Sequence, residues 1–564
     1  MKPLLLSLLC LTTFSAMAEE HYFRFVVTDK TELDQITRLI SIDNVRGDTV
    51  YAYANEAEYA GFRMLGYAIE PLPHPGGLYE HRMSDPSEGP MEWDTYPTYP
   101  AYVTMMRNFA SAHPGICRLD TFGRSIQNRL LLALKISDNV ESEEDEPEAL
   151  YTSTMHGDET VGYVLLLRLA DYLLTKYGED TPEGQRVTGL VNGMEIWINP
   201  LANPDGSYWT SDSTVTGAHR GNRNGTDLNR DFPDRIADTV NTGAGREVET
   251  RAAMQFAAKH NFTVSANFHG GVRVVNYPWD NGAPSGTYSS CPDDAWFIQL
   301  SLAYSATNPD LLTGGFTNGI TNGCQWYAIF GGRQDWIYWW HGGRETTIEL
   351  WDTHNPPGAV LPQRWTNNRA SFLAYLEEGL KGIRGIVTDA QTDQPLKASV
   401  IIQNLPTVPV FTDSGVGDYH RPVRAGTYTI VVRAEGYRPD TVRNIVVTTG
   451  PATRVDVALQ PLGTGVDDPV AAAPQTAVLL QNYPNPFNGD AEIRFWVSGL
   501  GFRVWVTLGV YDLLGRRVAT LADEVLSPGV YTRRFEAGNL ASGVYLYRLS
   551  TPAGTVTRKM TLMK

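Results

Sequence analysis

The pattern of apolar residues changes at Gly382, and this change limits what the chain can fold into. Before it, helical segments such as 161–177 and 367–380 alternate with apolar strands such as 149–154 and 263–268. Beyond it, short strands of alternating polarity follow one another, separated by turns. Strands interleaved with helices predict an α/β domain built on a mixed sheet with helices on both faces. The later pattern predicts two all-β sandwich domains.

The chain is too long for a single hydrophobic core. Its 564 residues are 42% hydrophobic and 19% charged, so we expect several folded domains. Short strands and amphipathic helices precede a Pro/Gly-rich run at 71–77, which predicts a small α+β unit ahead of the α/β domain. The predicted division is 1–18 signal peptide, 19–90 α+β unit and linker, 91–381 α/β domain, 382–461 sandwich, 462–476 linker and 477–564 second sandwich.

The first 18 residues are typical of a secretory signal peptide. An apolar run over 4–14 leads to the small-residue sequence Ala16-Met17-Ala18. The run is too short to span a bilayer, so we expect cleavage after Ala18 and export of the mature protein. Export permits a disulfide, but Cys117, Cys291 and Cys324 are too few for a dense disulfide framework.

The charge of the chain restricts its partners. The formal net charge is −17, which disfavours nucleic acid and anionic membrane surfaces because like charges repel. No later segment is apolar for long enough to predict a membrane span.

Three short motifs predict a hydrolytic metal site. They are His156-Gly157-Asp158-Glu159, Asn267-Phe268-His269-Gly270-Gly271 and Glu345-Thr346-Thr347-Ile348-Glu349-Leu350. Two histidines and one carboxylate leave a zinc coordination position open for water, and a further glutamate can act as the base that water needs.

The predicted fold can bring these motifs together. His156 follows the strand at 149–154, and His269 follows the strand at 263–268. Ligands in open α/β sheets gather beyond the carboxyl ends of strands, so two histidines far apart in sequence can converge there. Alone, His156-x-x-Glu159 is weak evidence, because acids are also common in the first turn of a helix.

Further motifs in a shared order make the signal specific. Over roughly residues 95–461 the chain resembles the zinc metallocarboxypeptidases, and among them the regulatory N/E-type branch. Besides the first two motifs, the matches are Asn203-Pro204-Asp205-Gly206, Asp227-Leu228-Asn229-Arg230-Asp231-Phe232-Pro233-Asp234, Asn276-Tyr277-Pro278-Trp279-Asp280, Thr321-Asn322-Gly323-Cys324-Gln325-Trp326-Tyr327 and Gly331-Gly332-Arg333-Gln334-Asp335.

The resemblance implies a metal centre and its supporting acids. His156, Glu159 and His269 would hold one zinc ion per catalytic domain. Glu349 would be the general base that takes a proton from water and returns it to the leaving amine. Asp227 would hold the imidazole of His156 in place.

The resemblance also implies groups that bind a peptide C-terminus. Asn229 and Arg230 match a clamp for the terminal carboxylate, and Tyr327 matches the tyrosine that closes over it. Arg220 matches the cation that stabilises the tetrahedral oxyanion. Arg223 is a competing candidate for that role.

Specificity is the most testable implication. In N/E-type enzymes an aspartate and a glutamine line the pocket for a basic terminal side chain, and the matching residues here are Asp280 and Gln334. We therefore expect removal of C-terminal Arg or Lys from peptides or proteins. Arg273 and Arg333 depart from the usual pattern, and either could neutralise Asp280 by entering the pocket. The alternatives are a zinc amidohydrolase acting on cell-wall peptides or other terminal residues, and an inactive binding protein.

The flanking regions resemble known companions of such enzymes. Residues 382–461 are similar to the transthyretin-like sandwich of N/E-type enzymes. The ending, from Gln481-Asn482-Tyr483-Pro484 onward, is similar to bacterial C-terminal sorting domains of the type IX secretion kind. This implies a secreted or surface-displayed protein that engages secretion machinery. The 19–90 unit is either an activation propeptide or a packed accessory domain.

Overall fold

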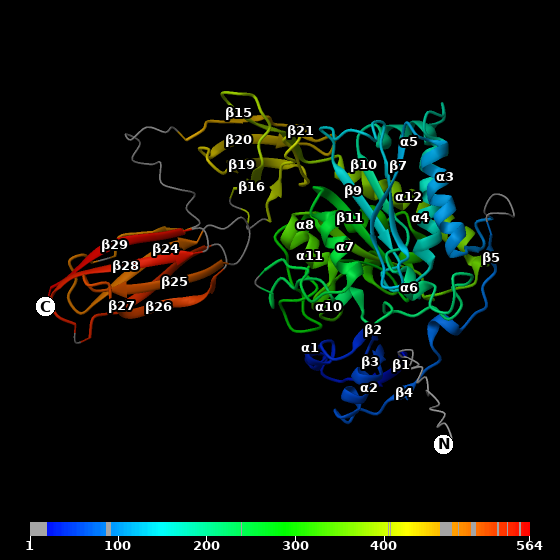
Figure 1. Ribbon diagram of the computed structural model, residues 1–564, viewed down its shortest axis with the longest axis horizontal. Helices are drawn as coiled ribbons and strands as arrows, with labels where there is room; N and C mark the ends of the chain where they lie inside the picture. Colours follow the sequence, from blue (N-terminus) through cyan, green and yellow to red (C-terminus); the bar gives the residue numbers. More distant parts are fainter. Residues whose placement is uncertain are drawn as a thin grey trace, which may run out of the picture.

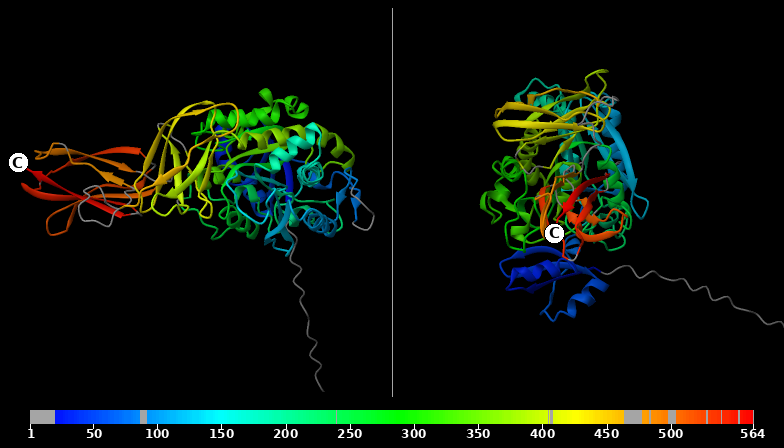
Figure 2. Two further views of the ribbon diagram at one scale, coloured as in Figure 1. Left: turned by 90° about the horizontal axis from the view of Figure 1, so that it is seen from above. Right: turned by 90° about the vertical axis from the view of Figure 1, so that its left-hand side faces the viewer.

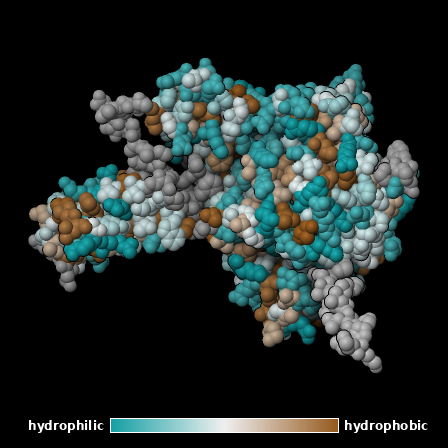
Figure 3. All heavy atoms as spheres, in the orientation of Figure 1, coloured by the Kyte–Doolittle hydropathy of each residue, from teal (hydrophilic) through white to brown (hydrophobic). Residues whose placement is uncertain are grey.

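The computed structural model describes residues 20–563 except 86–91, 239, 404, 406–407, 463–476, 483, 498–503, 527–528, 539 and 552–553. The predicted signal peptide and residues 463–476 of the predicted linker lie outside the described residues. Within the described ranges, no helix has both the length and the apolar character needed to cross a bilayer. The face in Figure 3 is largely hydrophilic, with scattered apolar residues.

A mixed eight-stranded sheet forms the centre of the α/β domain (Figure 1). Its four middle strands run parallel, and the pairs beside them are antiparallel except the outermost pair of 273–277 with 320–322, which is parallel. Every residue of the middle strand at 262–269 is buried, as expected for a sheet covered on both faces. In sheet order the strands are β13 (Ile320–Asn322), β12 (Arg273–Tyr277), β14 (Arg344–Leu350), β11 (Phe262–His269), β9 (Glu148–Ser153), β10 (Glu195–Asn199), β8 (Leu130–Ile136) and β7 (Cys117–Arg124).

Helices cover both faces of this sheet, as the sequence predicts (Figures 1 and 2). On one face, apolar side chains of α3 (Tyr99–Ala112), α4 (Val161–Lys176), α5 (Pro182–Val191), α8 (Asp294–Ser305) and α12 (Leu361–Gly379) form the largest core with the sheet. On the other face, α7 (Val248–Ala257) and α11 (Arg333–His341) form a smaller hydrophobic core with the sheet. Successive side chains of β9 point to opposite faces of the sheet: Tyr151 packs in the larger core and Leu150 in the smaller core.

The N-terminal unit is a four-stranded sheet with two short helices, and it packs against the α/β domain. The strand order is β2 (Ser41–Arg46), β3 (Thr49–Asn55), β1 (Glu20–Val26) and β4 (Glu70–Pro71), with helices α1 (Leu33–Ile36) and α2 (Glu56–Arg63). Its apolar core includes Val272, Val274 and Trp326 of the α/β domain. The unit therefore shares a hydrophobic core with the α/β domain.

Two all-β sandwiches follow, as predicted, each made of two sheets. The first pairs β18 (Asp418–Arg421), β15 (Ile383–Asp389), β21 (Thr453–Arg454) and β22 (Val457–Leu459) with β17 (Val410–Phe411), β16 (Ala398–Ile402), β19 (Gly426–Ala434) and β20 (Asp440–Val447). The second pairs β23 (Ala477–Leu479), β24 (Asp490–Val497) and β27 (Gly529–Glu536) with β26 (Arg517–Leu526), β25 (Val504–Tyr511), β28 (Gly543–Thr551) and β29 (Gly554–Leu562).

A buried ion pair joins the first sandwich to the α/β domain. Asp293 accepts from Arg344 at 2.8 Å and from Arg421 of the sandwich at 2.6 Å. Both arginine side chains are fully buried.

Cys117, Cys291 and Cys324 are free and buried, so the disulfide that export would permit is absent from this structure.

Candidate functional site

Three side chains from two chain segments converge at the carboxyl ends of the central strands. His156 and Glu159 lie in the turn between β9 and α4, and His269 is the last residue of β11. The Nδ1 atoms of His156 and His269 are 3.0 Å apart, and each lies 2.8 Å from an oxygen of Glu159. All three side chains are almost completely buried.

The protonation of His156 makes this group suitable for a metal. Asp227 Oδ1 lies 2.9 Å from Nε2 of His156, and a proton held there by Asp227 would leave the Nδ1 lone pair facing Glu159 and His269. Two imidazole nitrogens and a carboxylate directed at one point match the ligand set of a catalytic zinc ion. The residues present therefore fit zinc.

Glu349 lies beside this group. It is the partner of His269 in the parallel pairing of β11 and β14. Burial, followed by the nearby carboxylates of Glu159 and Asp43, raises its pKa well above the usual range. Its Oε2 has no hydrogen-bond partner among the described residues. The side chain is thus available to exchange a proton at this position.

Arg220, rather than Arg223, belongs to the site. Nη1 of Arg220 lies 3.0 Å from Glu159, and its Nε lies 3.2 Å from Asp227. The guanidinium of Arg223 instead lies over the ring of Trp209, 4.3 Å from its centroid. The contact between Arg220 and Glu159 places a buried cation beside the candidate metal ligands.

The predicted carboxylate clamp is assembled around one backbone segment. Arg230 Nη2 donates to the carbonyl of Ile42 at 3.0 Å, and the Tyr327 hydroxyl donates to the carbonyls of Ile42 and Asp43 at 3.3 Å each. Asn229 lies on the same turn as Arg230, where its Oδ1 accepts the N–H of residue 333. Arg230 and Tyr327 therefore hold carbonyl oxygens of the N-terminal unit.

Asp280 and Gln334 come together as predicted. Gln334 Nε2 donates to Oδ1 of Asp280 at 3.0 Å, and Asn276 Nδ2 donates to the same oxygen at 3.0 Å. Asp280 is 2% exposed, and this burial raises its pKa to about 6 despite the amide hydrogen bonds. A nearby cation would favour its charged form.

The two arginines that depart from the family pattern do not neutralise Asp280. Arg273, the first residue of β12, pairs with Asp352 at 2.9 Å. Arg333 points to the sheet, where it pairs with Glu345 at 3.2 Å and donates to Thr152. Both guanidinium groups are therefore engaged by partners other than Asp280.

The sequence patterns did not reveal three further residues at this site. Asp43 Oδ1 lies 2.9 Å from His354 Nε2 and 3.5 Å from Arg220 Nη1. Ser41 donates to Asp227 and accepts from Nε of Arg220 at 2.9 Å. No motif marks Ser41, Asp43 or His354, because their importance arises from how the N-terminal unit packs on the α/β domain.

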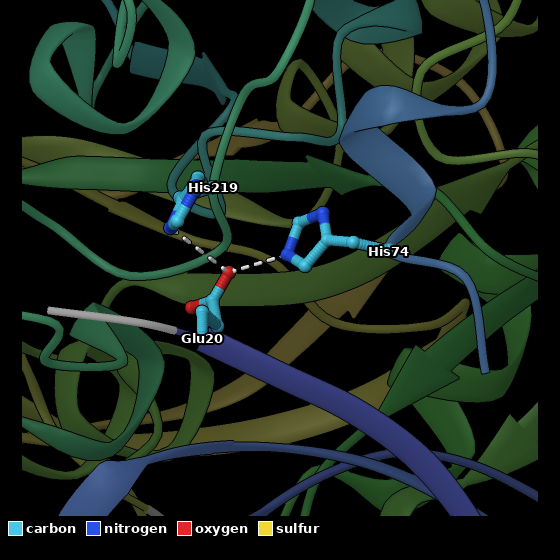
Figure 4. Close-up of side chains that lie close together, drawn as sticks. All are labelled: Glu20, His74 and His219. Carbon is cyan, nitrogen blue, oxygen red and sulfur yellow. Dashed lines mark hydrogen bonds and ion pairs between the residues drawn. The ribbon is translucent and has the colours of Figure 1, made fainter. Parts of the chain in front are cut away.

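Glu20 anchors the N-terminal unit next to Arg220 (Figure 4). Its carboxylate accepts the backbone N–H groups of Arg220 and Gly221 at 2.8 and 3.0 Å. Nδ1 of His74 accepts a backbone N–H, so its Nε2 carries the proton donated to Glu20 at 2.9 Å. His219 Nδ1 lies 3.7 Å from the same oxygen. The unit is thus fixed to the loop that carries Arg220.

Three family models match the chain in the order of its folded regions. The zinc carboxypeptidase model matches residues 102–371, the carboxypeptidase regulatory-like domain matches 382–460, and the secretion system C-terminal sorting domain matches 481–563. These matches agree with the family resemblance seen in the sequence. The boundaries predicted around them stay predictions.

Curated relatives are carboxypeptidases. The catalytic chain of carboxypeptidase N from Rattus norvegicus is 34% identical over 411 residues, which cover 66% of this chain and 88% of the relative. Carboxypeptidase M from Mus musculus is 35% identical over 347 residues, or 59% and 76% of the two chains. Carboxypeptidase D from Homo sapiens is 38% identical over 375 residues, which cover 64% of this chain.

The match to human carboxypeptidase D spans only 26% of that relative's length. Among solved structures, carboxypeptidase A from Helicoverpa armigera has a TM-score of 0.48 and 15% sequence identity, and the match covers 64% of this chain and 97% of that one.

Proposed function

We propose that this chain, which belongs to the zinc carboxypeptidase family, removes the C-terminal residue from peptides or proteins by hydrolysis. The observation that carries the proposal is the convergence of His156, Glu159 and His269, with Glu349 beside them. These residues would hold one zinc ion per catalytic domain. When bound, zinc would polarise the scissile carbonyl and lower the pKa of a water molecule toward about 7.

The side chains divide the remaining chemistry among them. Glu349 takes a proton from the attacking water and returns it to the nitrogen of the leaving amine. The guanidinium of Arg220 stabilises the negative charge that develops on the carbonyl oxygen. Asp227 supports two side chains of the site: it orients the imidazole of His156, and it lies 3.2 Å from the guanidinium of Arg220.

The clamp restricts cleavage to the last peptide bond. Arg230 and Tyr327 already hold carbonyl oxygens in this structure. In the active enzyme they would bind the terminal carboxylate of a substrate together with Asn229, through charge-assisted hydrogen bonds. An internal peptide bond offers no such carboxylate, so the site acts as an exopeptidase.

The preferred terminal residue is arginine or lysine. Asp280 is buried and hydrogen-bonded by Gln334, and neither Arg273 nor Arg333 neutralises it. A buried carboxylate costs free energy unless a cation pairs with it, so it favours a basic side chain in this pocket.

The N-terminal unit keeps the enzyme latent until it is removed. Ser41, Ile42 and Asp43 of β2 occupy the groups that the substrate would use, namely Arg220, Arg230 and Tyr327. A substrate C-terminus and β2 cannot bind these groups at the same time. The unit therefore acts as an inhibitory propeptide, one of the two alternatives that the sequence left open.

The regions outside the catalytic domain direct the protein out of the cell. The sorting-domain match at 481–563 supports recognition by secretion machinery, followed by release or surface display. The predicted signal peptide supports the same route. The sandwich at 382–461 would support the catalytic domain, to which it is joined through Asp293 and Arg421.

The assay that tests the activity compares hippuryl-Arg with hippuryl-Phe, using chain from which the N-terminal unit has been removed and to which zinc has been added. We expect faster release of arginine and no release by the Glu349→Gln variant. Faster release of phenylalanine would reject the preference for basic residues but would still support exopeptidase activity. Hydrolysis of acylated amino acids or cell-wall peptides alone would favour the amidohydrolase alternative.

A further inference from the structure

A second group of potential metal ligands lies where the α/β domain meets the first sandwich. Asp145 belongs to the loop between β8 and β9, and Asp418 and His420 lie on β18. Nε2 of His420 is 2.9 Å from Oδ2 of Asp418 and 4.0 Å from Oδ1 of Asp145. One donor atom from each residue lies within 4.8 Å of the other two. None of the three residues is among the candidate catalytic residues.

One oxygen of Asp145 is left for a ligand. Its Oδ2 pairs with Arg454 and lies 3.7 Å from Arg384. Its Oδ1 is buried and has no hydrogen-bond partner among the described residues. The side chains of Asp418 and His420 are only 9% and 8% exposed. A buried polar atom without a partner costs free energy, which a bound cation would offset.

The surroundings carry an excess of negative charge. A cavity of about 40 Å³ lies at this junction and is lined by Asp418 and His420 together with Glu143, Glu195 and Asp413. Glu143 and Asp413 interact with each other although both are acids, which raises the pKa of Glu143 beyond the effect of burial.

Glu195 is a further buried acid that lines this cavity. It is 3% exposed, and its Oε1 has no hydrogen-bond partner among the described residues. Lys135 pairs with its other oxygen at 2.9 Å. Burial of this acid raises its pKa to about 7 even so. The junction thus holds more carboxylate charge than its own cations neutralise.

We propose that Asp145, Asp418 and His420 form a second zinc site, which fastens the sandwich to the catalytic domain. Ligands about 2.0–2.2 Å from zinc lie roughly 3.0–3.6 Å apart, so separations of 2.9 and 4.0 Å need only small side-chain movements. One imidazole and two carboxylates suit zinc, and water from the adjacent cavity completes its coordination. The ion bridges two domains, so its role is structural.

Metal counting on the full chain tests this proposal independently of catalysis. Protein dialysed against micromolar Zn²⁺ is analysed for bound zinc. We expect about two ions per wild-type chain and about one for His420→Ala, which keeps the catalytic ion. The matched control is His341→Ala, because His341 lines the same cavity but is outside the trio. It should retain about two ions. Equal zinc counts in wild type and His420→Ala would overturn the proposal.

A second measurement removes the catalytic ion from the comparison. In a chain with both His156→Ala and His269→Ala, added Zn²⁺ should raise the melting temperature by about 4 °C or more, because a ligand that binds only the folded state stabilises it. Adding His420→Ala should abolish that rise, whereas adding His341→Ala should preserve it. A zinc-induced rise that survives His420→Ala would contradict the site. Neither readout depends on carboxypeptidase activity, so failure of the proposed function leaves this test intact.

Discussion

The carboxylate of Asp43 lies 2.9 Å from Nε2 of His354, although 311 residues separate them in the chain. The same carboxylate lies 3.5 Å from Arg220, the candidate oxyanion cation. Tyr53 of the neighbouring strand donates to Asp158, next to the candidate metal ligand Glu159, at 2.7 Å. Contacts of this kind connect the N-terminal unit to the catalytic centre, and they lead to the first two predictions.

Replacing Asp43 by asparagine should partly activate the unprocessed chain. The variant loses charge-assisted contacts to His354 and Arg220, each worth about 1.5–3 kcal/mol. The fraction of molecules in which the N-terminal unit has left the active site should therefore rise by about tenfold or more. The rate of C-terminal arginine release measures it. Asp48→Asn, an exposed position between β2 and β3, serves as the control and should stay latent. An Asp43→Asn chain no more active than this control would argue against latency through Asp43.

The hold of the N-terminal unit should weaken in alkaline solution. Burial alone would lower the pKa of His354, but the charge and hydrogen bond of Asp43 raise it to about 9. The ion pair between Asp43 and protonated His354 stabilises the docked N-terminal unit fully below about pH 6.5, the pKa of a free histidine. This stabilisation is lost as the pH rises through about 9. The activity ratio of intact to processed chain should rise across that window. In His354→Gln the ratio should stay flat, and a wild-type ratio equally flat would exclude His354 as the titrating group.

Replacing Asp280 by asparagine should remove the preference for basic residues. The loss of one charge-assisted contact lowers kcat/KM for hippuryl-Arg by about 10- to 150-fold, while hippuryl-Phe changes little. Arg273→Gln is the control, since Arg273 pairs with Asp352 instead. Because the pKa of Asp280 is raised to about 6, the wild-type preference should also weaken as the pH falls through about 6. An unchanged Arg-to-Phe ratio in Asp280→Asn would mean that another group selects the side chain.

Replacing Asp227 by asparagine should weaken zinc binding by about 10- to 100-fold, because this carboxylate holds the proton on Nε2 of His156. Competition with a chelator measures the affinity. Asp231→Asn is a nearby control, since Asp231 accepts a backbone N–H of residue 247 outside the metal group. Equal affinities in the two variants would show that Asp227 does not support the ligand.

Replacing Asp293 by asparagine should destabilise the junction between the catalytic domain and the first sandwich. Arg344 and Arg421 would lose their shared carboxylate while fully buried, at a cost of about 3–5 kcal/mol. Denaturant unfolding measures the change. Glu183→Gln, which removes an exposed pair with Arg369, should cost about 1 kcal/mol or less. Similar losses in both variants would contradict a stabilising role for the buried pair.

Much of the catalytic domain could be predicted from local patterns. The strand predicted at 263–268 and the helix predicted at 161–177 each lie within one residue of β11 and α4 at both ends. Their apolar periodicity decides where they are buried, so the strand-end position of His269 follows. The helix predicted at 367–380 begins at Leu361 instead, because a proline in its first turn is compatible with helix.

The rest depends on packing that no local pattern encodes. The direction of Arg333 is set by Glu345, a buried acid on the adjacent strand β14. The pairing of Asp43 with His354 requires the N-terminal unit to pack on the α/β domain. Spacing and composition report neither event, because each contact is decided by three-dimensional neighbours rather than by sequence neighbours.

The most direct test of the central claim is hydrolysis in heavy-oxygen water, followed by mass spectrometry. A zinc-loaded chain without its N-terminal unit is given a peptide that ends in arginine. We expect a peptide one residue shorter, with heavy oxygen in its new terminal carboxylate, unlabelled arginine and no internal cleavage. Glu349→Gln should yield no product. Internal fragments, or an intact peptide despite bound zinc, would show that the protein is not a zinc-dependent carboxypeptidase.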